Sequence, residues 1–234
     1  MEWAETKVLM SHPYYHARSA AQRWGGVWQD YWPIEHWFDS SKSYCIDPRH
    51  RMLLHQPYGI ELCLEIFGEL WQRPSDHQTV PTELIAIQHI QEDFAGTVPS
   101  LEQWFDHTTT PAWLRPSTAI AAMCVERFVG NQADYHSFET WFNRPQRYGD
   151  DPRYKLLVLN TFAAFLCEQT LGIVWQRPSD AKQIPTRIIA EAIINRMCGG
   201  YIPAPLEILK FTPVKPWMSQ GAKALSRQFA EALG

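Results

Sequence analysis

The sequence predicts a mainly α-helical protein made of two tandem helical-bundle repeats of about 104 residues that pack together. Sliding the chain along itself by 104 residues aligns Ala17–Trp113 with Ala121–Trp217 without a gap, and 31 of the 97 aligned pairs are identical. Apolar residues recur at helical spacing, whereas the alternation typical of strands is sparse. A position that both copies keep is expected to serve the fold, and a position that only one copy keeps is a candidate for function.

The repeat divides the chain into an extension at 1–10, a first copy at 11–114, a second copy at 115–218 and a C-terminal amphipathic helix at 219–234. In the first copy, helices are expected over 13–24 and 33–43, and Gly25-Gly26 is a fitting stop for the first of them. Asp47-Pro48, an N-cap aspartate before a proline in the first turn, begins a long helix over 48–70. Its counterpart in the second copy begins at Asp151-Pro152.

Pro57 is expected to kink the long helix in the first copy only, because the second copy has Thr161 and a smooth apolar run there. The block Trp71–Asp76 returns unchanged as Trp175–Asp180 and predicts a loop or short hairpin. This block is either a turn that each copy needs for itself or a contact between the copies or between two chains. Further helices are expected over 82–94 and 100–106.

Composition gives no signal for several classes of function. The net charge is −4, no run of lysine or arginine stands out, and we expect no clear nucleic-acid footprint. No apolar stretch approaches the roughly 20 residues that cross a bilayer, so the chain is expected to be soluble, cytoplasmic and without a membrane partner. The five cysteines form no CxxC pair and are expected to be free thiols. A homodimer or a protein partner stays open.

Histidine separates the two copies. Eight of the nine histidines lie in the first copy or its lead-in, and none of the eight has a histidine opposite it. Opposite His16, His55 and His89, the second copy has Ile120, Leu159 and Ile193. These positions therefore point inward, where a polar imidazole costs a few kcal/mol unless it is hydrogen-bonded or bound to a metal. A shared metal or catalytic centre explains them together, and a buried network of histidines and water is the alternative.

Carboxylates accompany these histidines. His89 and Glu92, with Asp93 beside them, share one face of a helix, and His36 and Asp39 are again three residues apart. The second copy loses both pairs. Imidazole and carboxylate on facing helices form the metal sites of helical bundles. The candidate ligands for Zn, Fe or Mn are therefore His16, His36, Asp39, His55, His89 and Glu92. With an open position, metal-activated water would make the protein a hydrolase.

The stretches His12-Pro-Tyr-Tyr-His-Ala17, Arg49-His-Arg51, Gln88-His89 and Glu92-Asp93 resemble a family of small His-rich proteins from bacteria and phages, catalogued as a domain of unknown function. The resemblance covers the first copy well and the second more weakly. It implies a tandem duplication with a degenerate second copy and brings no activity. The alternative to a metal centre is therefore a non-enzymatic phage or defence-associated module that captures a protein partner or a small ligand.

Overall fold

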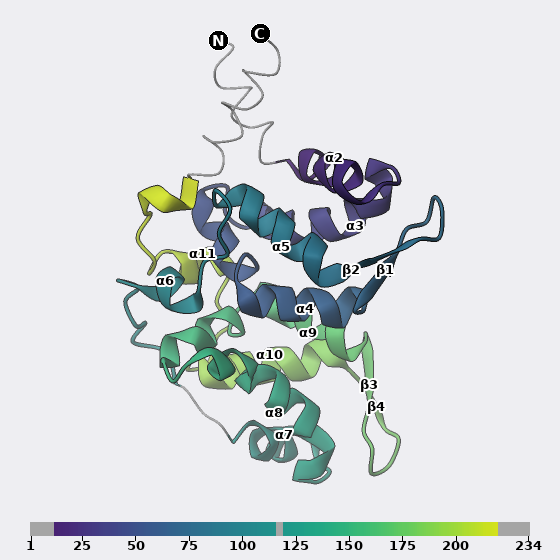
Figure 1. Ribbon diagram of the computed structural model, residues 1–234. Coiled ribbons are helices and arrows are strands. Elements are labelled where there is room, and N and C mark those ends of the chain that lie inside the picture. Colours follow the sequence, from purple (N-terminus) through teal and green to yellow (C-terminus); the bar gives the residue numbers. More distant parts are fainter. Residues whose placement is uncertain (1–11, 116–118, 220–234) are drawn as a thin grey trace. The chain divides into compact units, whose positions relative to one another are not determined.

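The computed structural model describes residues 12–115 and 119–219 and is mainly helical (Figure 1). The described chain forms two compact units. Unit 1 comprises the residues up to Gln103 together with the segment that begins at Val214, and unit 2 comprises Trp104–Pro213. The extension expected at 1–10 and nearly all of the expected C-terminal helix lie outside the described residues.

Unit 1 contains four longer helices and one short hairpin. Its helices are α2 (Pro13–Trp24), α3 (Trp28–Asp39), α4 (Pro57–Phe67) and α5 (Thr82–Asp93), and its strands are β1 (Leu70–Gln72) and β2 (Thr79–Pro81). Shorter elements are the 3-10 helices η1 (Ser40–Ser43), η2 (Pro48–Leu53) and η6 (Pro216–Ser219). Helix α6 (Leu101–Phe105) lies where the chain passes into unit 2.

Unit 2 repeats this order of elements, except that the counterpart of α3 is divided into a 3-10 helix and an α-helix. Its helices are α7 (Ile120–Phe128), α8 (His136–Asn143), α9 (Thr161–Leu171), α10 (Thr186–Met197) and α11 (Pro205–Leu209), its strands are β3 (Val174–Gln176) and β4 (Gln183–Pro185), and its 3-10 helices are η3 (Gln132–Tyr135), η4 (Arg144–Tyr148) and η5 (Pro152–Leu157). Among the described residues of both units, no helix is long and apolar enough to cross a membrane. The five cysteines are buried thiols outside any disulfide, as expected.

The first predicted helix is confirmed, and the second is displaced. Helix α2 ends at Trp24, where Gly25 takes the positive φ of 82° that favours glycine. Helix α3 begins at Trp28 rather than at Pro33, because the Asp30 carboxylate accepts the Val27 N–H at 2.8 Å and caps the helix there. After Asp39 the chain tightens into the 3-10 helix η1.

The predicted long helix over 48–70 is wrong, and so is its proline kink. The segment is two elements in both units, and α4 begins at Pro57, which occupies a first-turn position that tolerates proline. The break comes from a side-chain amide in the preceding position. Gln56 accepts the Gly59 N–H at 3.2 Å, and Asn160 accepts the Ala163 N–H at 2.9 Å in unit 2. A capped helix start, present in both copies, therefore replaces the kink expected in one.

The repeated Trp-Gln-Arg-Pro-Ser-Asp block forms an antiparallel hairpin that closes onto the corner between α2 and α3. Trp71 pairs with Val80 across the hairpin. Asp30 accepts the backbone N–H of Ser75 at 2.9 Å and its hydroxyl at 2.6 Å. Arg73 forms an ion pair with Asp76 at 2.7 Å and donates to the carbonyl of Trp24. We call this set of contacts the hairpin clasp.

Unit 2 contains the same hairpin clasp. Asp134 accepts the Ser179 N–H at 2.9 Å and its hydroxyl at 2.8 Å, and Arg177 pairs with Asp180 at 2.5 Å and donates to the carbonyl of Phe128 at 2.6 Å. The hairpin is thus confirmed, and its conserved polar residues have partners within their own unit. A local structural need accounts for the identity of the two blocks. A role in dimer formation stays a prediction.

Replacing Asp30 by Ala should lower the free energy of unfolding by about 2 kcal/mol, because one buried carboxylate accepts three hydrogen bonds. Asp134→Ala should cost a similar amount, since Asp134 accepts the equivalent three. Urea unfolding of each variant measures the cost. The exposed Asp150→Ala is the control and should stay within about 0.5 kcal/mol of the wild type. Equal stability of all three variants would contradict a stabilising clasp.

Candidate metal centre

Three segments of unit 1 bring a group of histidines and acids into its core. Helix α5 carries His89 and Asp93 one turn apart, and α3 carries Asp39 on the facing side. His55 lies in the short link between η2 and α4. All four side chains are buried, with at most 5% of each residue exposed. We call Asp39, His55, His89 and Asp93 the His–acid cluster.

The cluster has the dimensions of a metal site. One ligand atom from each of its four residues lies within 4.8 Å of every other. His55 Nε2 is 3.1 Å from His89 Nε2 and 3.1 Å from Asp93 Oδ2, and His89 Nε2 is 3.9 Å from the same carboxylate oxygen. A metal about 2.0–2.2 Å from each donor would separate its ligands by similar distances. These buried groups could therefore hold a metal ion.

Neighbouring ionisable groups fix the orientation of three cluster residues. Glu35 Oε2 lies 2.5 Å from His89 Nδ1, which leaves His89 Nε2 facing the cluster. Arg51 donates to Asp93 Oδ1 at 2.7 Å, and Lys42 pairs with Asp39 Oδ2 at 2.6 Å. A carboxylate on the outer nitrogen of a histidine is the usual support for a metal-bound imidazole. The cluster therefore has the second layer of contacts that such sites need.

His16 lies beside the cluster and forms a second group. Its ring is 4.2 Å from that of His89, and His16, Glu35 and His89 offer atoms within 4.8 Å of one another. Its Nδ1 meets Glu92 Oε2 at 2.7 Å. The three histidines that the sequence singled out thus lie in two overlapping groups, and His89 belongs to both. Glu92 contacts His16 and belongs to neither group.

His36 lies apart from these groups. It is exposed, and its ring stacks on Trp32 with centroids 5.3 Å apart. Two residues outside the candidate ligand set occupy the site instead. Asp93 could be found from the copies, because the second copy has Met197 there. Glu35 gave no such signal, because the second copy keeps a glutamate, Glu139, at its position.

Burial and charge set the protonation of the cluster. Burial lowers the pKa of His55 and His89, so both imidazoles are neutral near neutral pH. Burial alone would raise the pKa of Asp93, but Arg51 and the surrounding histidines hold it well below its ordinary value. His55, His89 and Asp93 are therefore in the neutral and ionised states that bind metals.

Protons occupy the adjacent group. Burial would lower the pKa of His16, but the hydrogen bond to Glu92 and the charge of Asp93 raise it to about 9. Burial raises the pKa of Glu35 well above its usual range. Several atoms here that could bind a metal make no hydrogen bond within the described chain, namely His16 Nε2, Glu35 Oε1 and Asp39 Oδ1. Such buried polar atoms are costly, and a bound ion is one way to satisfy them.

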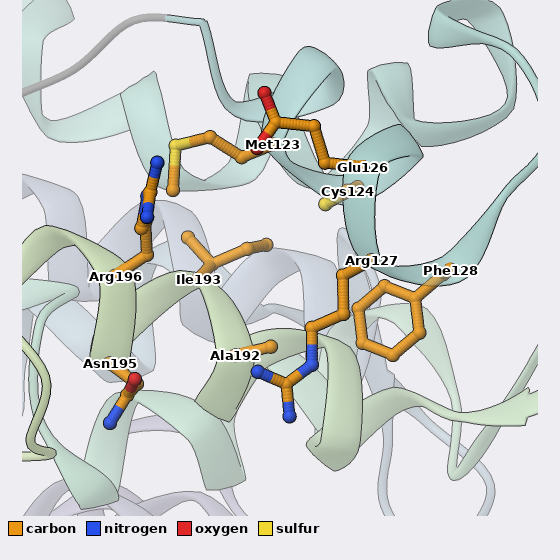
Figure 2. Close-up of a pocket in the computed structure, with 9 residues that line it drawn as sticks. All are labelled: Met123, Cys124, Glu126, Arg127, Phe128, Ala192, Ile193, Asn195 and Arg196. Carbon is orange, nitrogen blue, oxygen red and sulfur yellow. The ribbon is translucent and has the colours of Figure 1, made fainter.

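Unit 2 shows what replaces the site. Ile193 stands at the position of His89 and lines a pocket of about 360 Å³ between α7 and α10, together with Met123, Ala192 and Arg196 (Figure 2). Their counterparts in unit 1 form a hydrogen-bonded cover beside His16, in which Ser19 and Gln88 both donate to Glu92 Oε1, at 2.5 and 2.6 Å. The second copy has lost the polar cover along with the cluster.

The duplication has a counterpart among known sequences. The family described as domain of unknown function DUF6915 matches residues 11–114 and, a second time, 116–218. The chain belongs to this family. No curated protein and no solved structure matches the chain. The DUF6915 match confirms the tandem duplication and carries no activity, so the function rests on the chemistry of the site.

The stability of the metal-free protein should be greatest near pH 6.5. The folded protein keeps His55 and His89 neutral, and burial also lowers the pKa of His50 to about 3. The unfolded chain binds protons at all three as the pH falls below 6.5, so stability falls on the acid side. His16, with a raised pKa of about 9, keeps a proton that the unfolded chain releases above 6.5, so stability also falls on the alkaline side.

Urea unfolding at a series of pH values measures this profile. Each group should contribute about 1.4 kcal/mol per pH unit within its range. His16→Ile introduces the residue of the second copy and should reduce the alkaline slope while leaving the acid slope unchanged. The raised pKa of Glu35 retains part of the alkaline slope in this variant. An unchanged alkaline slope in His16→Ile would contradict a buried, protonated His16.

Proposed function

We propose that unit 1 binds one divalent transition metal through Asp39, His55, His89 and Asp93. The observation that carries this proposal is the convergence of four buried donors to within 4.8 Å, at positions that the second copy gives up together. The second copy has Asn143, Leu159, Ile193 and Met197 there. Structural needs common to both copies do not explain a polar set that only one copy keeps.

Charge balance favours one divalent ion. Four carboxylates lie in or beside the cluster, on Glu35, Asp39, Glu92 and Asp93, and two basic side chains face them, on Lys42 and Arg51. Counted with their ordinary charges, these groups leave two negative charges at a largely buried site, where uncompensated charge is costly. Two protons, on His16 and Glu35, balance them in the metal-free protein. A divalent cation supplies the same charge and releases those protons, so we expect tighter binding at higher pH.

The donor set narrows the identity of the metal. Two imidazoles and two carboxylates, without a thiolate, suit Zn, Fe or Mn better than Cu(I) or an iron–sulfur cluster. Glu35 accepts a hydrogen bond from His89 Nδ1–H when His89 binds a metal through Nε2. The ligands come from α3, from the link before α4 and from α5, so the ion would connect three separate segments of unit 1.

Burial decides between a structural and a hydrolytic role. A hydrolytic metal needs a position open to water and substrate. Each cluster residue is at most 5% exposed, and four protein donors complete a tetrahedral set. The arrangement therefore supports a closed, structural site. The hydrolase that the sequence suggested would need a path to the metal, and we do not assign hydrolysis to this site.

His55→Leu and His89→Ile, which introduce the residues of the second copy, should each remove bound metal almost completely. Their effects should not add, because the two ligands belong to one site. Elemental analysis of protein purified without a histidine tag measures the metal content. Glu35→Gln should weaken binding about 10- to 100-fold without abolishing it.

The matched control is His36→Ala, which removes an exposed histidine outside the cluster and should leave the metal content unchanged. A chelator should lower the unfolding temperature of the wild type and leave that of His89→Ile unchanged. The proposed site would be ruled out if the wild-type protein contained no metal and its unfolding temperature changed neither with a chelator nor with added metal.

A further inference from the structure

Helix α3 of unit 1 carries a row of aromatic rings that the metal site does not use. Trp28, Trp32 and His36 follow one another at intervals of four residues, with ring centroids 5.8 and 5.3 Å apart. The rings of Trp32 and His36 are nearly parallel, at 10°. Tyr14 of α2 lies edge-on to Trp28 at 5.0 Å, and His12 lies 5.9 Å from Trp32. We call these five residues the aromatic ladder.

The ladder belongs to the first copy alone. Opposite Trp28, Trp32 and His36, the second copy has Gln132, His136 and Thr140. The core partners of the same helix are kept, since Tyr31, Trp37 and Phe38 recur as Tyr135, Trp141 and Phe142. The fold therefore needs the inward rings in both copies and does not need the ladder, whose residues are exposed or half-buried.

The charges around the ladder favour an anionic ligand. Within residues 12–40 the acids are Asp30, Glu35 and Asp39, and each is at most 5% exposed. Arg18 and Arg23 are exposed on α2 of the same layer, and the Arg18 guanidinium lies 5.7 Å from the centre of the Tyr14 ring. Beside them, Glu92 of α5 contacts Ser19 and has 18% of its side chain exposed. Two exposed arginines against one partly exposed acid make this surface locally positive in a chain whose net charge is −4. The net charge of the chain does not reveal this positive surface, because it counts the buried carboxylates of residues 12–40 together with the exposed arginines.

A hollow adjoins the ladder at its N-terminal end. A surface pocket of about 450 Å³ is lined by residues of α2 and the start of α3, including Arg18, Gln22 and Trp28. It places an indole and a guanidinium side by side. The equivalents of Arg18 and Gln22 in the second copy are Ala122 and Glu126, so unit 2 has lost the cation and gained an acid.

We propose that the aromatic ladder and its flanking arginines bind single-stranded nucleic acid. Every nucleobase has a face that stacks on aromatic rings, and arginines beside the rings contact the phosphates. The row of rings lies along the helix axis with a rise of about 6 Å for every four residues. Trp28 and Trp32 lie at 81° and Trp32 and His36 at 10°, so unstacked bases would stack at the solvent-exposed side of the row. A neutral sugar would stack on the same rings but would gain no electrostatic attraction from a surface whose carboxylates are mostly buried.

Fluorescence anisotropy with a labelled oligothymidine of about 12 nucleotides, at low salt, tests this proposal on the full chain. Trp28→Gln and Trp32→His introduce the residues of the second copy and should each weaken binding about fivefold or more, since a stacked base is lost. Arg18→Ala, also the second-copy residue, should weaken binding and reduce the dependence of log affinity on log salt by about 0.7.

The matched control is Arg127→Ala, which removes an exposed arginine on α7, the counterpart of α2 in unit 2, and should leave binding unchanged. Circular dichroism and metal content verify that each variant is folded. If a tryptophan variant does not fold, the Arg18→Ala variant still tests the proposal. Three results would overturn the proposal: no oligonucleotide binding at low salt, wild-type binding by the ladder variants, or an equal loss in Arg127→Ala. Retention on an uncharged polysaccharide without oligonucleotide binding would also overturn it.

Discussion

In each unit, one buried carboxylate joins the corner between two helices to the hairpin, which carries the longest block of identity between the two copies. Asp30 caps α3 and at the same time accepts two hydrogen bonds from Ser75 of the hairpin, so the helix corner and the hairpin share a single acceptor. Gly26 is part of the same arrangement, because a Cβ there would lie 2.4 Å from the carboxylate and its φ is 75°. Unit 2 repeats this with Asp134 and Gly130. The orientation of α3, and with it the placement of Asp39, follows from this contact.

Buried charge explains how the two copies diverged. In unit 1 the guanidinium of Arg51 is compensated by Asp93. The second copy has Met197 in place of that aspartate and Lys155 in place of Arg51. The Lys155 ammonium instead donates to the side chain of Asn143 and, at 2.8 Å, to the carbonyl of Phe142. Burial lowers the pKa of Lys155 to about 8, which reduces the cost of keeping an amine without a carboxylate. Loss of the cluster thus required a coordinated change in several buried residues.

Comparison of the copies was enough to find much of the fold and part of the site. Asp39, His55 and His89 stood out because the second copy has replaced each of them, whereas Glu35 was hidden because a glutamate survives opposite it. His36 entered the candidate set through its spacing from Asp39, but it directly follows Glu35, and one residue turns a helix by about 100°, away from the core. The break before α4 was missed because a capping amide depends on local geometry, which the apolar pattern does not encode.

The end of each copy belongs to the unit that is formed mainly by the other copy. Trp217 and Met218, at the end of the second copy, belong to unit 1, where Met218 accepts a hydrogen bond from Arg51 and Trp217 lies against Phe94. The end of the first copy belongs to unit 2, where the carbonyl of Thr108 accepts from Arg153. Neither copy therefore contains a complete unit. A chain with one such copy would complete its unit either with its own end or with that of a second chain, whereas in the fused chain each copy supplies the end of the other unit within one molecule.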